Sequence, residues 1–296
     1  MEHHQRIDFR DQISSNKVKS FFLMLIIFVV IILMGYVISK ATDPSLFFII
    51  MIFASLFSIF YVWLSYYNSH KIAIASVGAK KASREGHKQY YDLVEGLTLA
   101  SGLPMPELYI MHSPQINAFA SGRDPKHAVI CVTDGALEKL DKRELEGVLA
   151  HELGHIASFD IRYMTLVAVA VGMISIISQL FLRSLWFGGG GNRDNKGQAI
   201  FMLIGIALAI LAPIVVLLVQ MSISRKREFS ADASAVKFTR YPAGLIGALK
   251  KIKHDHAPPE KKISKAVAPL FISNPFKNLG STHPPLDERI KVLERM

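Results

Sequence analysis

The stretch VLAHELGHIASFD, residues 148–160, contains two histidines four residues apart, and a glutamate directly follows the first. Residues with this spacing lie one above the other on one face of an α-helix, so His151 and His155 can offer two imidazole nitrogens to one metal ion. Glu152 is rotated by about 100° around the helix axis, close enough to reach a metal-bound water without binding the metal. The alternative is a solvated helix face with two unrelated histidines.

The sequence before this stretch predicts where the helix begins. Asp141, with Glu144 three residues later, has the pattern of a capping box, and Leu145, Val148 and Leu149 supply an apolar face. We therefore predict a helix that starts here and carries both histidines.

A small sheet is expected ahead of this helix. Residues 79–101 predict another helix, which GLPMPE at residues 102–107 ends. Three short stretches rich in β-formers and bounded by turn residues follow, at residues 107–113, 116–122 and 127–135. They predict the strands of the sheet.

A catalytic zinc site needs a third protein ligand and an open position. SRKREFSADAS, residues 224–234, places Glu228 just past the end of an apolar run, with Asp232 four residues later. We expect Glu228 to complete the metal site and Asp232 to accept a hydrogen bond from a ligand imidazole. Taken alone, the two acids would indicate a solvated helix face. Their place beside the apolar run, together with the histidine pair, favours the site.

Four long apolar runs indicate a membrane protein. Hydrophobic residues make up 51% of the 296 residues and cluster at residues 21–38, 46–64, 164–182 and 199–223. As a helix, the first run reaches about 27 Å, close to the hydrocarbon thickness of a bilayer. We therefore predict four transmembrane helices.

Two alternatives to this interpretation fit the sequence less well. A signal peptide at the first run would have a shorter apolar stretch, and no A-x-A-like cleavage site follows YVISKATDP at residues 36–44. Buried core helices of a soluble domain would need more covering sequence than the chain contains.

The charges that flank the runs predict the orientation, because lysine and arginine accumulate on the cytoplasmic side of membrane helices. The segments before the first run, after the second and after the fourth are basic, whereas residues 183–196 form a glycine-rich loop with fewer cations. Both termini and the polar segments are thus expected in the cytoplasm, in a multi-pass protein of the cell membrane.

The formal net charge of +10 fits an anionic membrane surface, so no nucleic-acid partner is expected. The single cysteine, Cys131, excludes an intramolecular disulfide.

The motifs HELGH, SRKREFSAD and STHPPLDERI, together with INAFASG at residues 116–122, resemble those of the HtpX-type integral-membrane zinc metalloproteases, relatives of the CAAX-prenyl endopeptidases. The resemblance covers nearly the whole chain, including four apolar runs in the same order. It implies one zinc ion bound by His151, His155 and Glu228, with Glu152 as the catalytic carboxylate. Spacing and topology lead to the same four residues.

The resemblance also implies a side chain that stabilises the oxyanion of the reaction. His283 or Arg289 could play this part. The alternative is that two prolines start a terminal helix on which Arg289 pairs with a nearby acid.

INAFASG is similar to an edge strand that holds the substrate backbone by strand addition. This similarity would make Asn117, Ala118 and Phe119 residues of the substrate cleft. The stretch could also be an ordinary strand of a small sheet.

The predicted fold class is a mainly α membrane protein, with four transmembrane helices and a cytoplasmic α+β zincin-like protease domain. That domain carries HELGH on a helix beside a small β-sheet. Residues 1–67 are expected to hold the first two membrane helices, 68–163 the sheet and the HELGH helix, 164–223 the last two membrane helices, and 224–296 the third zinc ligand.

The expected function is zinc-dependent hydrolysis of peptide bonds at the cytoplasmic membrane face. The resemblance implies polypeptide substrates, above all misfolded or damaged membrane proteins. It also implies a role in quality control under stress and membrane lipid around the helices.

A membrane scaffold with a structural zinc is the alternative function, from another class of protein. Glu152 argues against it, because a structural site has no use for a general base. A CAAX-processing role would need a cavity for a lipid tail, and four helices are few to enclose one.

Overall fold

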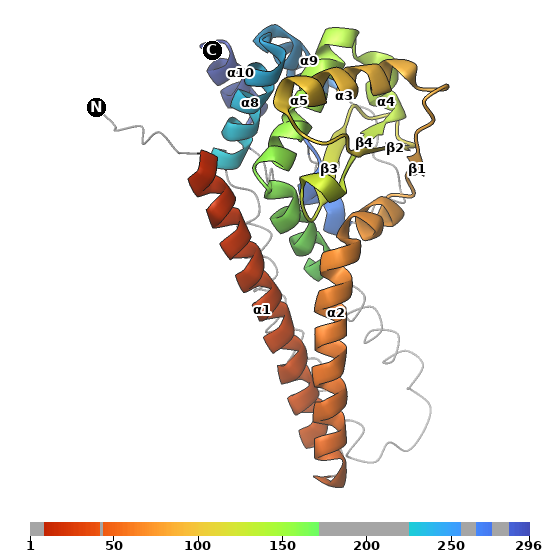
Figure 1. The fold of residues 1–296 in the computed structure, drawn as a ribbon, viewed down its shortest axis with the longest axis vertical. Helices are drawn as coiled ribbons and strands as arrows, with labels where there is room; N and C mark the ends of the chain where they lie inside the picture. The colour runs from red at the N-terminus through yellow and green to blue at the C-terminus, as the bar shows by residue number, and fades with distance from the viewer. Residues whose placement is uncertain (1–8, 42–43, 172–224, 256–264, 274–283) are drawn as a thin grey trace, which may run out of the picture.

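The computed structural model describes residues 9–41, 44–171, 225–255, 265–273 and 284–296 (Figure 1). The fourth apolar run, the glycine-rich loop, most of the third run and His283 lie outside the described residues.

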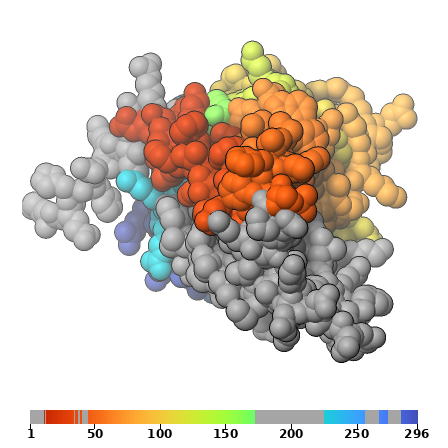
Figure 2. All heavy atoms as spheres, turned by 90° about the horizontal axis from the view of Figure 1, so that it is seen from below, coloured from red at the N-terminus to blue at the C-terminus, as the bar shows by residue number. Residues whose placement is uncertain are grey.

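Two long helices extend away from the rest of the molecule (Figure 1). They are α1 (Phe9–Ala41) and α2 (Phe47–Ser76), with the short 3-10 helix η1 (Pro44–Leu46) before α2. Within the described part of the chain, residues 13–33 and 47–76 are long and apolar enough to cross a membrane. Figure 2, seen from the far end of the helices, shows the atoms of α1 and α2 side by side. At this contact a Cβ on Gly35 would collide with the Cβ of Ala54, so a small residue lets the helices approach.

The predicted sheet is present and has one additional short strand. Its strands are β1 (Lys80–Lys81), β2 (Glu107–Met111), β3 (Ala118–Gly122) and β4 (Ala128–Thr133), in the spatial order β1-β2-β4-β3. The β2–β4 pair is parallel, and the β1–β2 and β3–β4 pairs are antiparallel. The sheet is therefore mixed, with β3 at one edge.

The remaining elements surround the sheet. They are α3 (Lys88–Ser101), η2 (Pro125–His127), α4 (Asp134–Lys139), α5 (Lys142–Ala157), α8 (Arg225–Thr239), α9 (Pro242–His254), η3 (Lys265–Leu270) and α10 (Leu286–Leu293). Residues 160–171 are also helical and lead toward the undescribed part of the third run.

Both faces of the sheet are covered, because successive side chains of β4 enter two different cores. Ile130 and Val132 join a core built with α3, α5 and α9, whereas Val129 and Cys131 join one with the end of α2 and with η3. The helix at residues 160–171 packs against α1 and α2 in a third apolar cluster. The histidine helix is thus fixed between the sheet and the helices that follow it in the chain.

The helix expected at residues 79–101 begins only at Lys88. The first residues of that range pair with β2 as a strand, and Ala82 continues the pairing with a hydrogen bond to the carbonyl of Leu108 at 2.9 Å. Gly78 has a φ of +63° at the end of α2, which starts this change of direction. The tertiary pairing with β2 outweighs the helical preference of the sequence.

The predicted capping box of α5 is confirmed. Asp141 accepts hydrogen bonds from the backbone N–H groups of Arg143 and Glu144, and the Glu144 side chain accepts from the backbone of Asp141. This cap fixes the start of the helix that carries HELGH.

Candidate metal centre and active site

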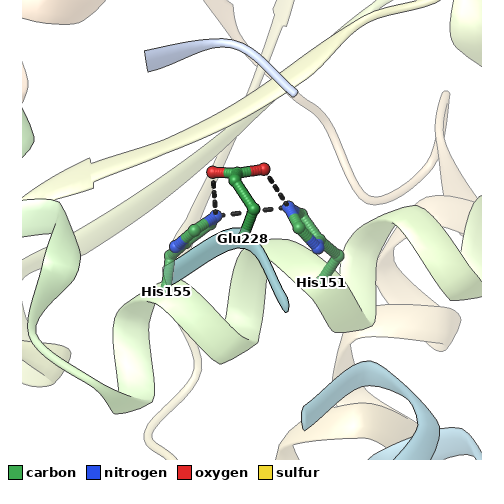
Figure 3. A group of neighbouring side chains, drawn as sticks. All are labelled: His151, His155 and Glu228. Carbon is green, nitrogen blue, oxygen red and sulfur yellow. Dashed lines mark hydrogen bonds and ion pairs between the residues drawn. The ribbon is translucent and has the colours of Figure 1, made fainter. Parts of the chain in front are cut away.

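Three buried side chains from two helices converge. His151 and His155 project from one face of α5 toward Glu228 of α8 (Figure 3). The Nε2 atoms of the histidines are 3.2 Å apart, and the Glu228 oxygens lie 3.7 Å from Nε2 of His151 and 3.6 Å from Nε2 of His155. Each residue offers one ligand atom to a group in which all atoms lie within 4.8 Å of one another. The structure therefore brings together the three residues predicted as metal ligands.

A carboxylate faces the other nitrogen of each imidazole. Nδ1 of His151 is 2.9 Å from Oδ1 of Asp232, and Nδ1 of His155 is 3.1 Å from Oδ2 of Asp160. An ionised carboxylate only accepts hydrogen bonds, so each Nδ1 carries a proton and donates it. Each Nε2 is left to face the Glu228 carboxylate, which is the orientation that a metal-binding histidine requires.

The close approach of α5 and α8 depends on the glycine of HELGH. A Cβ on Gly154 would lie 3.0 Å from the Cβ of Ser234 and 3.1 Å from the Cα and the carbonyl oxygen of Ala231. The small residues of SADAS and the missing side chain at Gly154 let the two helices pack closely. This packing brings Glu228 to the histidine pair.

Arg289, fully buried on α10, connects to both acids of α8. Its Nε donates to Oδ2 of Asp232 at 2.9 Å, and its Nη2 donates to Oδ1 at 2.6 Å. Its Nη1 lies 3.3 Å from Oε2 of Glu228. Burial alone would raise the pKa of Asp232, but the charge of Arg289 and the hydrogen bond from His151 lower it. The ion pair that the sequence left open for Arg289 is thus present on a terminal helix.

The surroundings of His151 favour a neutral imidazole. Burial, the largest cause, and the charge of Arg289 lower the pKa of His151 to about 4, against the opposing effect of Asp232. A neutral ring with Nδ1 protonated keeps a lone pair on Nε2.

The surroundings of His155 favour a positive charge. Burial alone would lower its pKa, but the hydrogen bond to Asp160 and the charges of Glu228, Asp160 and Glu152 raise it to about 9. A proton on the ring can supply this positive charge, and so can a metal ion bound between the ring and Glu228.

The donor set and its spacing fit a zinc ion. Ligand atoms at about 2.0–2.1 Å from a tetrahedral zinc lie about 3.3 Å apart. The separation of 3.2 Å between the two Nε2 atoms matches this value, and the Glu228 distances of 3.6 and 3.7 Å exceed it slightly. Two histidines and one glutamate form a known ligand set of catalytic zinc sites, which keep a fourth position open.

Glu152 lies next to the ligands, with its carboxyl group near strand β3. It is buried and hydrogen bonds to the backbone of Ala120. Burial is the main cause that raises its pKa to about 7, and the charge of Glu228 adds to the rise, while His155 and the Ala120 hydrogen bond oppose it. A carboxyl group with a pKa near neutrality can both accept and return a proton.

The residues expected to line the substrate cleft lie at the edge strand, and a segment of the chain itself covers them. Phe119 forms an antiparallel bridge with Phe271, and the N–H of Ile272 donates to the carbonyl of Ala118 at 2.9 Å. The side chain of Asn117 donates to the carbonyl of Ser273 at 2.8 Å and accepts from its N–H at 3.3 Å. Residues 271–273 therefore pair with the outer edge of the chain from Asn117 to Phe119.

Asp160 is a site residue that the sequence analysis missed. It closes the quoted stretch, five residues after His155, and a search for an acceptor for the second ligand imidazole would have pointed to it. Asn16 contacts Asp160 from α1 across 144 residues, and no local signal in the sequence indicates this contact.

A helix-borne H-E-x-x-H motif, completed by a buried glutamate from a later helix beside a small sheet, defines the class of protein as a metalloprotease. Residues 81–296 match peptidase family M48, and the chain belongs to this family.

Relatives of known name support the assignment. The chain is similar to a protein named protease HtpX homolog from Caldanaerobacter subterraneus subsp. tengcongensis, with 47% identity over 83% of this chain and 84% of the relative. A protein of the same name from Dictyoglomus thermophilum is 39% identical over 97% of this chain and 95% of the relative.

A solved structure shares the fold. The crystal structure of S. mikatae Ste24p aligns with a TM-score of 0.51 at 21% sequence identity, over 94% of this chain. The chain spans 65% of the length of that structure. The chain is a membrane metalloprotease of the HtpX type, and its substrates are polypeptides.

Proposed function

We propose that the protein is a zinc-dependent endopeptidase in which His151, His155 and Glu228 bind one zinc ion. The convergence of these three side chains carries the proposal, since both imidazoles turn Nε2 toward the same carboxylate. Asp232 and Asp160 hold the rings in this orientation through Nδ1. Arg289 keeps Asp232 ionised and in place.

Glu152 is the proposed general base. A zinc ion held by the three ligands would lower the pKa of a bound water toward neutrality and polarise the substrate carbonyl. Glu152 would take the proton of the attacking water and return it to the leaving amine, since its carboxyl group is buried beside the three ligands. Because Glu152 is buried, bulk water does not compete for this proton. Either His283 or Arg289 would donate a hydrogen bond to the oxyanion, and Nη1 of Arg289 lies 3.3 Å from Oε2 of the proposed ligand Glu228.

Substrate backbone would bind along β3 at Asn117, Ala118 and Phe119. The antiparallel pairing of Phe271 with Phe119 supports this proposal, because an added substrate strand would use the same backbone groups. A substrate that binds there would replace residues 271–273.

The protease part is proposed to lie at the cytoplasmic face, with four membrane helices in the whole chain and both termini inside. Aromatic and basic side chains gather where α2 meets the protease part: Arg123 lies 4.8 Å from the ring of Tyr67, and Arg162 lies 5.7 Å from the ring of Tyr66. Aromatic rings mark membrane interfaces, and cations mark the cytoplasmic interface.

The proposed division of the chain is into residues 1–67, 68–163, 164–223 and 224–296. The helix α2 bends at Asn68, next to the first of these boundaries.

In the cell, the proposed substrates are misfolded or damaged membrane proteins, because the site lies beside the membrane helices. A scaffold with a structural zinc is the competing function. The buried carboxyl group of Glu152 beside the ligands favours the enzyme, since a structural site needs no proton acceptor.

Two variants of the purified full-length protein test the proposal. Glu152→Gln should keep one zinc ion per chain and lose casein cleavage, because the ligands remain and the base is lost. Glu228→Ala should lose zinc and cleavage together, and Glu146→Ala, in a salt bridge with Arg143 on the same helix, should retain both. Zinc content and cleavage rate are measured on each. Near-normal cleavage by Glu152→Gln contradicts the mechanism, and full zinc content in Glu228→Ala contradicts the ligand assignment.

A further inference from the structure

Asn16 is a buried polar residue of α1, within the candidate membrane span at residues 13–33. Its side chain is 2% exposed. A polar side chain at this position needs hydrogen-bond partners and usually has a functional reason. The partners of Asn16 lie in the segment that directly follows the HELGH helix.

The amide of Asn16 bridges two groups of that segment. Its Nδ2 donates to Oδ1 of Asp160 at 2.6 Å and to the carbonyl oxygen of Ser158 at 2.9 Å. The other carboxylate oxygen of Asp160 accepts a hydrogen bond from the Ser158 hydroxyl at 2.8 Å and lies 3.1 Å from Nδ1 of His155. A continuous chain of hydrogen bonds therefore runs from the membrane helix α1 to one of the proposed zinc ligands.

Asp160 needs support from outside its own helix, because it follows a break in the chain. The helix α5 ends at Ala157, and Phe159 has a φ of +60°, an unfavourable conformation for a bulky residue. Lys17, next to Asn16, places its ammonium group 4.7 Å from the centre of the Phe159 ring. Two neighbouring residues of α1 thus hold the turn that presents Asp160 to the histidine.

We propose that Asn16 is a positioning residue for the metal centre: it fixes Asp160, and Asp160 orients His155 so that Nε2 faces the metal. The proposal rests on the zinc site of the proposed function. It makes the membrane helix α1 part of the metal centre, so that the packing of α1 against residues 158–160 sets the affinity for zinc. Partners of ligand histidines have this effect in other metal sites, where their loss weakens binding by about 10–100-fold.

The test measures the dissociation constant for zinc of the full-length protein in detergent, by competition with a chromophoric chelator. Asn16→Ala should weaken zinc binding about 3–10-fold, less than an outer-shell partner in direct contact with the ligand. Asn16→Asp has the same shape but sets a second carboxylate against Asp160, and it should weaken binding more than alanine does. The melting temperature of each zinc-free variant is recorded in parallel.

Ser20→Ala is the matched control. Ser20 is buried one turn further along α1, and its hydroxyl donates to the carbonyl oxygen of Asn16 at 2.8 Å, so its loss disturbs the same helix but leaves Asp160 untouched. We expect its affinity for zinc to stay within about twofold of wild type. If Asn16→Ala and Asn16→Asp lower the melting temperature but bind zinc as tightly as wild type, Asn16 is only structural and the proposal is wrong. Failure of the wild-type protein to bind zinc would instead overturn the proposed function.

Discussion

Arg289 donates two hydrogen bonds to Asp232, 57 residues earlier in the chain, and this pair is completely buried. Asp232 in turn faces Nδ1 of His151, so the terminal helix α10 is connected to the proposed zinc ligand through one carboxylate. A buried carboxylate is stable as an ion only if its charge is compensated. The last helix of the chain is therefore required for the charge balance of the site.

Arg289→Met should destabilise the fold by about 3–5 kcal/mol, because it leaves Asp232 as an uncompensated buried charge. Zinc binding should weaken as well, since Asp232 orients His151. Thermal unfolding in detergent, with and without zinc, measures both effects. Arg84→Met, which breaks a surface salt bridge to Glu95, should leave the melting temperature almost unchanged. Equal melting temperatures for Arg289→Met and wild type would contradict the structural role.

Local patterns were sufficient for much of the site. The four-residue spacing of His151 and His155 depends only on helical periodicity, and the capping box at Asp141 depends on contacts within one turn. Glu228, which the structure places beside the histidine pair, was predicted from its position just past an apolar run that we expect to return the chain to the same side of the membrane. The first two inferences each need one helix, whereas the inference of Glu228 also needs the expected course of the apolar runs across the membrane.

The parts that the sequence could not predict depend on contacts between distant segments. Asn16 reaches Asp160 across 144 residues, and residues 271–273 pair with the edge strand that was expected to hold the substrate backbone. The strand at Lys80–Lys81 exists only because β2 offers it backbone partners. Such contacts follow from tertiary packing, which periodicity and spacing do not encode.

The orientation in the membrane can be tested with introduced cysteines. In whole cells, a membrane-impermeant thiol reagent should label Ser45→Cys, between α1 and α2, and should not label Lys88→Cys at the start of α3. Both positions are exposed, and the native Cys131 is fully buried, so it should not react. Labelling of both variants after permeabilisation is the control for reactivity. The reverse pattern in intact cells would invert the proposed topology.

Gly154 should be the most sensitive position of the HELGH motif outside its ligands and base, because the α5–α8 contact has no room for a side chain. A Cβ there would already lie 3.0 Å from the Cβ of Ser234 and 3.1 Å from backbone atoms of Ala231. Valine at Gly154 should push α8 away, destabilise the fold by about 1–3 kcal/mol and lower zinc content, because Glu228 moves with α8. Gly96→Ala is the matched control. Gly96 lies on the helix α3, and among the described residues outside its own helix backbone no atom would be within 4 Å of a Cβ there. The variant should stabilise the protein by about 0.5–1 kcal/mol. Thermal unfolding and zinc content measured on both variants decide the matter, and unchanged zinc content in Gly154→Val would show that the helix spacing does not control the position of Glu228.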